Sequence, residues 1–482
     1  MTIKLYNSLT KQIEELKPIR PDEVSIYSCG PTVYSYAHIG NLRAFLFADF
    51  LQRTIREVGA YKVKWVMNIT NIDDKTIRDS QNSDVWKTDF GEMTNDALSN
   101  LEKLCNFYEV EFRKDIELLN IKNNDFYKMP RATDYIVQMK ELIIKIFNNG
   151  FAYVSGNSVY FSVGKWRENE IYGKLKKIDF ENFRPGSRVD SDEYEREQVS
   201  DFVLWKAKKE GEPFWTLEID GQNLEGRPGW HLECSAMEYD ILGLPFDIHT
   251  GGVDLKFPHH EDEIAQSKAG YGLEPTAMWC HNEFLEVEGK KMSKSLNNFY
   301  TLRDLIDKGI DPKDIRFAML SAHYRSKYNF TFADVEAAKK ARSKVQEFIY
   351  ELHSDIYGDS EADANSFKME VFSNLANDLH SPKALATIFS FINNSKAESF
   401  NKNSKRNLIS VFNQINNVYA VFEITKKLET SIPKNIIDLA DLRIQAKTDK
   451  NWAESDKLRN EILLFGYTIK DTKDGFEISK LM

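Results

Sequence analysis

Hydrophobic and polar positions over the first seventy residues predict a strand, a helix and a second strand. Residues 22–29 (DEVSIYSC) have the composition of a short strand. From Ile39 onward, apolar residues recur at helical spacing until Gly59, a residue typical of a helix C-terminus. Residues 61–70 form a second apolar run. Strand, helix and strand in this order make a βαβ unit, which predicts a parallel sheet.

The pattern of the next two hundred residues predicts an insertion into that sheet domain. Residues 92–150 have a helical pattern, and residues 151–225 mix short strands with charged loops. One acidic stretch, residues 190–198, is expected to be a solvated loop. Strand-like and helix-like patterns return at residues 248–270, where we expect the sheet domain to resume.

The C-terminal third of the chain has a mainly helical hydrophobic pattern. The helical pattern beyond residue 330 predicts a helical bundle, and residues 431–435 (SIPKN) are typical of a linker. Residues 436–482 predict two helices and a short hairpin with its turn at Lys473, Asp474 and Gly475. The order of these patterns predicts an α/β fold followed by a helical bundle and a small mixed domain.

Composition limits the class of protein. The chain has 482 residues, of which 42% are hydrophobic and 29% are charged, as in soluble globular proteins. It contains no apolar run of about 18 residues, and its N-terminus lacks the apolar core of a signal peptide. We therefore expect a cytoplasmic protein without a membrane segment. The net charge of −10 does not favour a nucleic-acid partner, but a local basic face would suffice for one.

The four cysteines are too widely spaced to predict disulfides, and the simplest interpretation is that they are small buried residues. Cys29 nevertheless lies in SCGPTVYSYAHIGN (residues 28–41), close to a histidine. His259 and Glu263 are four residues apart on a predicted helix and share one face. With Cys29 and Cys234 they would form a zinc shell of sulfur, nitrogen and oxygen. His260 is an alternative ligand, and a surface His–Glu pair with two buried cysteines is the alternative to any metal site.

A second cluster, KMSKS (residues 291–295), has lysines and serines at a spacing that suits a polyphosphate. Lysine ammonium groups neutralise charge that develops on phosphates. A solvated basic loop is the alternative. His38, at the start of a predicted helix, also suits phosphate binding, although a capping or buried histidine is common there.

Together these motifs resemble those of a known family. HIGN followed far downstream by KMSKS is similar to the paired signatures of class I aminoacyl-tRNA synthetases. The segments CGPTVYSYAHIGN, DFVLWK, GRPGWHLECSAM, DLKFPHHEDEIAQS and KMSKSLNNF resemble the cysteinyl-tRNA synthetases in particular. The similarity is specific over about residues 20–330. It is weaker beyond them, where KNWAESDKLRNEILLFGYTI resembles the C-terminal module of that family.

The resemblance implies a Rossmann-type parallel-sheet catalytic domain with an insertion, then a helical bundle and a small anticodon-binding domain. The expected parts are the first half of the catalytic domain (1–120), a connective insertion (121–225), the second half (226–290), a stem-contact fold with KMSKS (291–330), a tRNA-binding bundle (331–430) and the C-terminal domain (436–482).

The resemblance also implies the site residues. Zinc would be held by Cys29, Cys234, His259 and Glu263. ATP, with Mg²⁺, would be bound by His38, Asn41, Lys291 and Lys294, which would also stabilise the adenylation transition state. Thr70 and Asp254 would hold the amino group of L-cysteine, and Trp230 would pack against it.

The implied reaction joins L-cysteine to its tRNA through a cysteinyl-adenylate, and we expect a monomer. The sequence departs from the family pattern at Asn41, where the signature of the class has a second histidine, at TLEIDGQNLE (216–225) and at GFEISK (475–480). An alternative with the same catalytic core is an ATP-dependent ligase that joins cysteine to a small amine. A further alternative is an inactive homologue that binds RNA.

Overall fold

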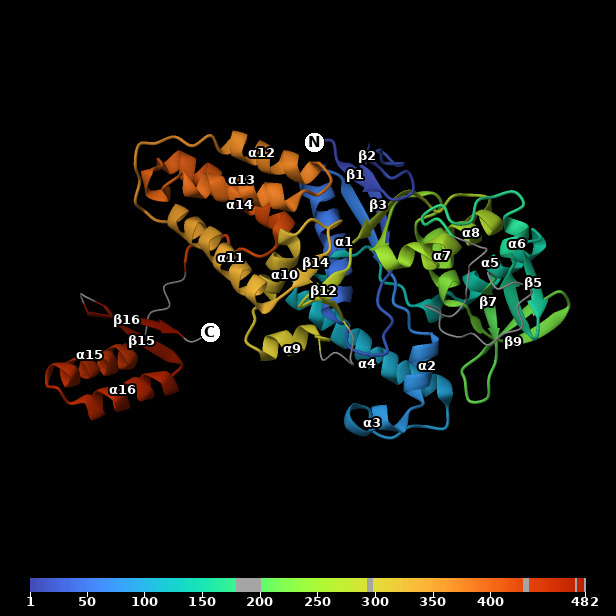
Figure 1. Ribbon diagram of the computed structural model, residues 1–482, viewed down its shortest axis with the longest axis horizontal. Helices are drawn as coiled ribbons and strands as arrows, with labels where there is room; N and C mark the ends of the chain where they lie inside the picture. Colours follow the sequence, from blue (N-terminus) through green and yellow to red (C-terminus); the bar gives the residue numbers. More distant parts are fainter. Residues whose placement is uncertain (179–200, 293–297, 428–432, 473–474, 481–482) are drawn as a thin grey trace. The chain divides into compact units, whose positions relative to one another are not determined.

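The computed structural model describes residues 1–178, 201–292, 298–427, 433–472 and 475–480 (Figure 1). The chain divides into two compact units, residues 1–424 and 425–482. The first unit has one continuous hydrophobic core, and the second has a small core of its own around Ile436, Ala440, Ile462 and Ile469.

A four-stranded parallel sheet lies at the centre of the first unit. Its strands are β3 (Glu23–Ser28), β4 (Lys62–Met67), β10 (Phe246–Gly252) and β11 (Thr276–Asn282), in the order β11-β10-β3-β4. Helix α1 (Ile39–Glu57) joins β3 to β4, and α8 (His259–Tyr271) joins β10 to β11. The two crossovers run in opposite directions along the sheet, so right-handed connections place these helices on opposite faces. The predicted βαβ unit and the α/β fold class are confirmed.

Strand β4 ends earlier than the predicted residue 70. The backbone N–H of Met67 donates to Lys128 O at 3.2 Å, and that of Ile69 donates to Pro130 O at 2.7 Å. An extended segment of the insertion thus pairs with the edge of β4 that is opposite β3, and this pairing continues past the end of the strand. Alternation of side chains along the sequence does not reveal this non-local pairing.

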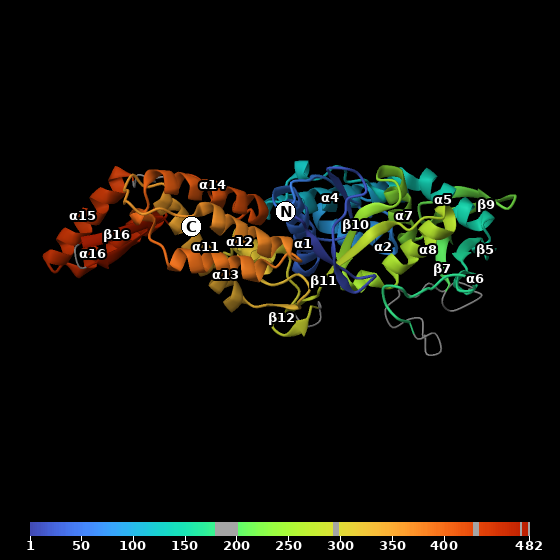
Figure 2. The same cartoon turned by 90° about the horizontal axis from the view of Figure 1, so that it is seen from above.

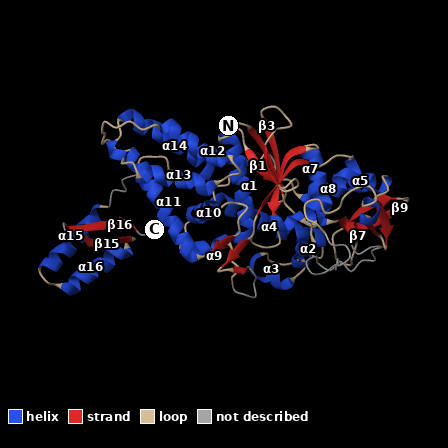
Figure 3. Cartoon of the chain, turned by 45° about the horizontal axis from the view of Figure 1, so that its top comes forward, coloured by secondary structure: helices blue, strands red, loops and turns tan. Residues whose placement is uncertain are grey.

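The insertion between β4 and β10 contains a second sheet, which is antiparallel (Figure 3). Its order is β5-β6-β7-β9-β8. The predicted acidic loop at residues 190–198 lies outside the described residues. The strands between β4 and β10 are β5 (Ala152–Ser155), β6 (Ser158–Phe161), β7 (Phe202–Ala207), β8 (Trp215–Ile219) and β9 (Gln222–Pro228). The helices in the same interval are α2 (Asp74–Ser80), α3 (Ser83–Asp89), α4 (Ala97–Leu118), α5 (Ile136–Asn148), α6 (Val163–Trp166) and α7 (Trp230–Ile241).

A small sheet and the predicted helical bundle follow the parallel sheet. The bundle lies on the α1 side, whereas α7, α8 and the insertion lie on the other side (Figures 1 and 2). Helix α1 packs against α10 and α14. These elements are β12 (Leu285–Val287), β13 (Lys290–Lys291), β14 (Tyr328–Phe330), α9 (Leu302–Asp307), α10 (Pro312–Ser321), α11 (Phe332–Leu352), α12 (Ala364–Ala376), α13 (Ser381–Asn393) and α14 (Lys402–Tyr419).

The N-terminal hairpin, β1 (Lys4–Asn7) and β2 (Gln12–Glu15), is an element that the sequence pattern did not predict. The second unit contains α15 (Lys434–Thr448), α16 (Trp452–Leu464), β15 (Tyr467–Thr472) and β16 (Gly475–Lys480), as predicted. Helix α15 begins directly after Pro433, so two residues of the expected linker are helical. Of the predicted turn, residues 473 and 474 lie outside the described residues. Among the described helices, none combines the length and the apolar character needed to cross a membrane.

Candidate functional site

Four of the predicted site residues follow strands of the parallel sheet at its carboxyl edge, where α/β proteins bind ligands. Cys29 directly follows β3, and Thr70 follows β4 by three residues. Asp254 follows β10 by two residues. His38 is the N-cap of α1. The strand order changes direction between β3 and β10, so the gap between these two strands is the natural binding crevice of this sheet.

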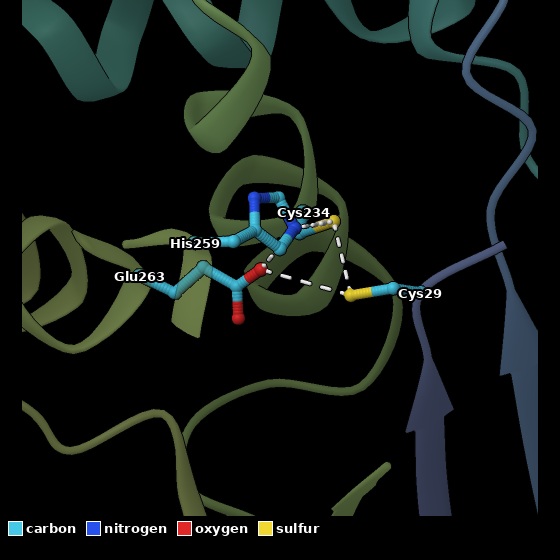
Figure 4. Close-up of side chains that lie close together, drawn as sticks. All are labelled: Cys29, Cys234, His259 and Glu263. Atoms are coloured by element: carbon cyan, nitrogen blue, oxygen red, sulfur yellow. Dashed lines mark hydrogen bonds and ion pairs between the residues drawn. The ribbon is translucent and has the colours of Figure 1, made fainter. Parts of the chain in front are cut away.

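Four predicted metal ligands converge in this crevice (Figure 4). Their donor atoms all lie within 4.8 Å of one another. Cys29 Sγ is 3.9 Å from Cys234 Sγ, which is 3.5 Å from His259 Nε2. Glu263 Oε1 is 2.9 Å from His259 Nε2 and 3.9 Å from Cys29 Sγ. The ligands come from the end of β3, the first half of α7 and the start of α8, so the fold brings three distant segments to one point.

These separations suit one tetrahedral ion. With zinc bond lengths of about 2.3 Å to sulfur and about 2.1 Å to nitrogen, a tetrahedron has S–S edges of about 3.8 Å and S–N edges of about 3.6 Å. The Cys29–Cys234 and Cys234–His259 separations match these edges. The His259–Glu263 edge is shorter, because these two groups form an ion pair. Both cysteines are free thiols rather than a disulfide. Sulfur, nitrogen and oxygen donors of this kind fit zinc.

A second group of donors shares two of these residues. Cys29 and Glu263 also lie within 4.8 Å of His249 and His260. Cys29 Sγ is 3.3 Å from His260 Nε2. His249 Nε2 lies between two carboxylates, 2.8 Å from Glu238 and 2.9 Å from Glu263. The alternative ligand His260 therefore remains geometrically open.

Buried charge couples the groups of this cluster. Burial alone would disfavour protonation of His259, but the Glu263 carboxylate and the Cys29 thiolate outweigh it and raise its pKa to about 10. Burial would raise the pKa of Glu263, but His249 and His259 hold it well below its ordinary value. Burial and the neighbouring Cys29 raise the pKa of Cys234 well above its ordinary value. A metal ion that binds this cluster must therefore displace protons from His259 and Cys234, because imidazole binds metals in its neutral form and cysteine as thiolate.

Trp230, the first residue of α7, borders the cluster. Its ring stacks on His259 with centroids 4.2 Å apart and planes 20° apart. The side chain remains 37% exposed, so one part of the indole is available to a bound molecule. The exposed part of the ring borders the four donor groups.

Thr70 is buried and hydrogen-bonded to two neighbouring side chains. Its hydroxyl donates to Glu233 Oε2 at 2.9 Å and accepts from Asn68 Nδ2 at 3.1 Å. Asn68 Oδ1 accepts from the backbone N–H of Gly30 at 2.9 Å. A Cβ atom at Gly30 would lie 1.7 Å from Asn68 O, so only glycine allows this close approach beside Cys29.

His38 and Asn41 form a capping box at the start of α1. His38 Nδ1 accepts from the backbone N–H of Asn41 at 3.2 Å, and Asn41 Oδ1 accepts from the backbone N–H of His38 at 3.4 Å. Because Nδ1 is an acceptor, the neutral ring carries its proton on Nε2. Burial lowers the pKa of His38 to about 4, although the charge of Asp254 opposes this. At pH 7 His38 is therefore a neutral donor.

The segment that follows KMSKS contacts the HIGN segment. The backbone N–H of Ile39 donates to Tyr300 O at 3.0 Å, and the ring of His38 meets that of Phe299 edge-on at 5.2 Å. Residues 299 and 300 follow KMSKS closely. Of the motif itself, the backbone of Lys291 pairs with Glu286 in the β12–β13 hairpin, and Lys294 lies outside the described residues.

Several buried polar residues of the site were missing from the prediction. The amino-acid pattern gives no sign that they are buried or which way their side chains point. They are Asn68, Glu233, Glu238, His249 and His281.

Comparison with known proteins identifies the family. A family described as "tRNA synthetases class I (C) catalytic domain" matches residues 15–340. A protein of Leptospira interrogans named cysteine–tRNA ligase is 42% identical over 99% of both chains. One of the same name from Brachyspira hyodysenteriae is 40% identical over 98% of both. The chain belongs to the cysteine–tRNA ligases, a family of class I aminoacyl-tRNA synthetases.

Solved structures of the same class share the fold. A methionyl-tRNA synthetase of Mycobacterium tuberculosis in complex with methionyl-adenylate gives a TM-score of 0.56 at 13% identity, over 83% of this chain and 92% of that one. A leucyl enzyme (LeuRS) of Agrobacterium radiobacter, in a ternary complex, gives 0.58 at 9% identity, over 84% and 85%. This family member therefore has the catalytic architecture of its class.

Proposed function

We propose that this chain ligates L-cysteine to its cognate tRNA in an ATP-dependent reaction through a cysteinyl-adenylate, with zinc at the cysteine side-chain pocket. The observation that carries the proposal is the convergence of two free thiols, an imidazole and a carboxylate at the end of β3, the strand that precedes the HIGN segment. A metal cluster at this position lies next to the place where ATP would bind.

Cys29, Cys234, His259 and Glu263 are the proposed zinc ligands. The set with both thiols is preferred to the set with His249 and His260, because His249 Nε2 already pairs with Glu238 and Glu263. A bound zinc ion would favour the thiolate of cysteine over the hydroxyl of serine, since it lowers the pKa of a thiol and binds sulfur well.

The other proposed roles follow from placement and chemistry. His38, a neutral Nε2–H donor, would hydrogen-bond the ATP phosphates, and Asn41 fixes its ring. Thr70 and Asp254 would hold the substrate ammonium, and Trp230 would pack against the substrate. Lys291 and Lys294 would neutralise charge on the triphosphate, with Mg²⁺ accompanying ATP.

The protein would do little covalent chemistry of its own. Its side chains hold the cysteine carboxylate in line with the α-phosphate, which it attacks to release pyrophosphate. The 3′-terminal adenosine of tRNA then attacks the activated carbonyl and releases AMP. We further propose that the bundle and residues 436–482 contact tRNA, within the six-part organisation expected from the sequence. The monomeric state and the cytoplasmic location stay predictions.

Two assays in series test this proposal. Cysteine-dependent exchange of pyrophosphate into ATP separates an enzyme from an inactive RNA-binding homologue. Adding tRNA then separates a tRNA ligase from a ligase that joins cysteine to a small amine. We expect exchange with cysteine but not with serine, followed by charging of tRNA. Exchange without charging would contradict the tRNA assignment, and absence of exchange would contradict the enzymatic one.

A further inference from the structure

Glu233 is a fully buried carboxylate that the proposed reaction does not yet use. It lies in the first turns of α7, directly before Cys234, and its Oε2 accepts from the Thr70 hydroxyl. Its other oxygen, Oε1, is buried and has no hydrogen-bond partner within the described part of the chain. Burial raises the pKa of Glu233 well above its ordinary value, so the carboxyl group has an unfavourable environment. Its contact with Thr70 therefore calls for an explanation.

The hydrogen bonds that the Thr70 hydroxyl can make explain its contact with Glu233. The backbone N–H of Gly30 can only donate, so Asn68 turns Oδ1 toward Gly30 and Nδ2 toward Thr70. The threonine oxygen therefore already accepts one hydrogen bond. It has one hydrogen and one lone pair left for all other partners.

An ammonium group can only donate, so Thr70 can hold one only through that last lone pair. The hydroxyl hydrogen must then go to another acceptor, and Glu233 Oε2 is the acceptor in contact with it. Without this acceptor, ammonium binding would leave a buried O–H unpaired, which is unfavourable.

We infer that Glu233 is a positioning residue: it takes the hydroxyl hydrogen of Thr70 and so makes Thr70 an acceptor selective for ligands with a protonated amino group. This inference rests on the proposed function, because it assumes that the ligand is cysteine with its ammonium at Thr70. The predicted ligand class is a thiol that carries a free α-ammonium, not a thiol acid without one.

The test compares two ligands that differ only in the amino group, L-cysteine and 3-mercaptopropionate, by calorimetry on the full zinc-loaded chain. Glu233→Met removes the acceptor at similar volume. We expect it to weaken cysteine binding about 10- to 100-fold, the usual effect of a hydrogen bond to a charged group. Binding of 3-mercaptopropionate should change less than about 3-fold.

Conservative and matched variants complete the experiment. Glu233→Gln keeps an acceptor oxygen and should retain the preference for cysteine to within about 5-fold. Thr70→Val should lose the preference, and adding Glu233→Met to it should cause no further loss. Asp262→Asn removes a different buried carboxyl group, which Tyr172 contacts, and should leave the preference unchanged.

Equal weakening of both ligands by Glu233→Met, or no weakening at all, would overturn the inference. If this variant loses zinc or unfolds, Glu233→Gln and Thr70→Val decide: loss of preference in the first, or its retention in the second, would also overturn it. Wild-type exchange of pyrophosphate with cysteine is measured first. Its absence would count against the proposed function, whereas normal exchange with equal weakening would count against Glu233 alone.

Discussion

Two adjacent histidines, His259 and His260, compete for one place in the proposed zinc shell. His259 Nε2 faces Cys234 and Glu263, whereas His260 Nε2 faces Cys29 at 3.3 Å and its Nδ1 is 2.8 Å from His281 Nε2. His259 Nδ1 has an equivalent partner in His231 at 2.8 Å, so only the groups that face Nε2 distinguish the two rings. The side chain that faces a second thiol is the better candidate ligand.

We predict that His259→Ala reduces the bound zinc to less than about one tenth, because one of four ligands is lost. His260→Ala should retain most of the metal. Metal analysis after dialysis against a weak chelator measures both, and Cys105→Ser, a buried cysteine on α4 away from the donor groups, serves as the control. Loss of zinc in His260→Ala with retention in His259→Ala would instead select the alternative donor set.

His38 makes folding stability depend on pH. Its pKa in the folded chain is about 4, below the ordinary value of 6.5, because it is buried. As pH falls below 6.5 the unfolded chain takes up a proton first, so the stabilisation is lost between pH 6.5 and 4. His38→Asn keeps a good N-cap but removes this titration.

We therefore predict that wild-type protein loses about 2 kcal/mol more free energy of unfolding than His38→Asn between pH 7.5 and pH 5. Urea unfolding at the two pH values measures this difference. Equal losses in the two proteins would show that His38 does not titrate as proposed.

Individual side chains differ in how far the sequence reveals them. Cys29, Cys234, His259 and Glu263 have side chains whose chemistry suggests a metal, and motif resemblance joins them. The sequence gives no comparable signal for Glu233 and Asn68, because their proposed roles depend on burial and on which of their atoms faces Thr70. Those properties arise only when α7 packs beside the end of β4.

Among elements, the contact between α1 and α10 depends on one buried ion pair. Arg316 Nη2 is 2.5 Å from Asp49 Oδ2, and both side chains are fully buried. Arg316 also donates to Leu119 O and Tyr419 O, at the ends of α4 and α14. One guanidinium therefore links four helices that the sequence places far apart.

We predict that Arg316→Met lowers the free energy of unfolding by about 3 kcal/mol, because it leaves Asp49 and two carbonyls short of a partner. Lys313→Met on the same helix removes an exposed ion pair with Glu423 and should cost less than about 1 kcal/mol. Urea unfolding followed by fluorescence compares the two. A loss in Arg316→Met no larger than that in Lys313→Met would contradict the structural role.

Periodicity predicted α1 and most later helices because each has one apolar face, but it failed where partners are non-local. Residues 128–130 pair with β4 and with the residues just after it, and the hairpin β1–β2 has strands of only four residues. The hydrophobic periodicity of the sequence also does not predict that α14 packs on α1. The sequence pattern becomes helical at residue 330, where the helical bundle begins. The hydrophobic core nevertheless continues across this boundary.

At the scale of the whole molecule, the chain divides into two compact units at residue 424. This division suggests that truncation there can separate cysteine activation from tRNA charging. A truncation at residue 330 would expose apolar surface of α1 and α10, whereas residues 425–482 have a separate core. We predict that residues 1–424 alone exchange pyrophosphate with cysteine at close to the full rate but charge tRNA at least about tenfold more slowly, because phosphate contacts dominate affinity for RNA.

Both rates are measured on the same preparation, with the full chain as reference. Full-rate charging by the truncated protein would contradict a role of the second unit in binding tRNA. Loss of exchange in a folded truncation would show instead that the catalytic centre depends on this unit.

Zinc recognition of the substrate thiol is the central claim, and X-ray absorption at the zinc edge tests it most directly. The four proposed ligands supply two sulfurs, one nitrogen and one oxygen. Adding L-cysteine should add one sulfur at about 2.3 Å, and adding L-serine should not. An unchanged number of sulfur neighbours with saturating cysteine would contradict the account.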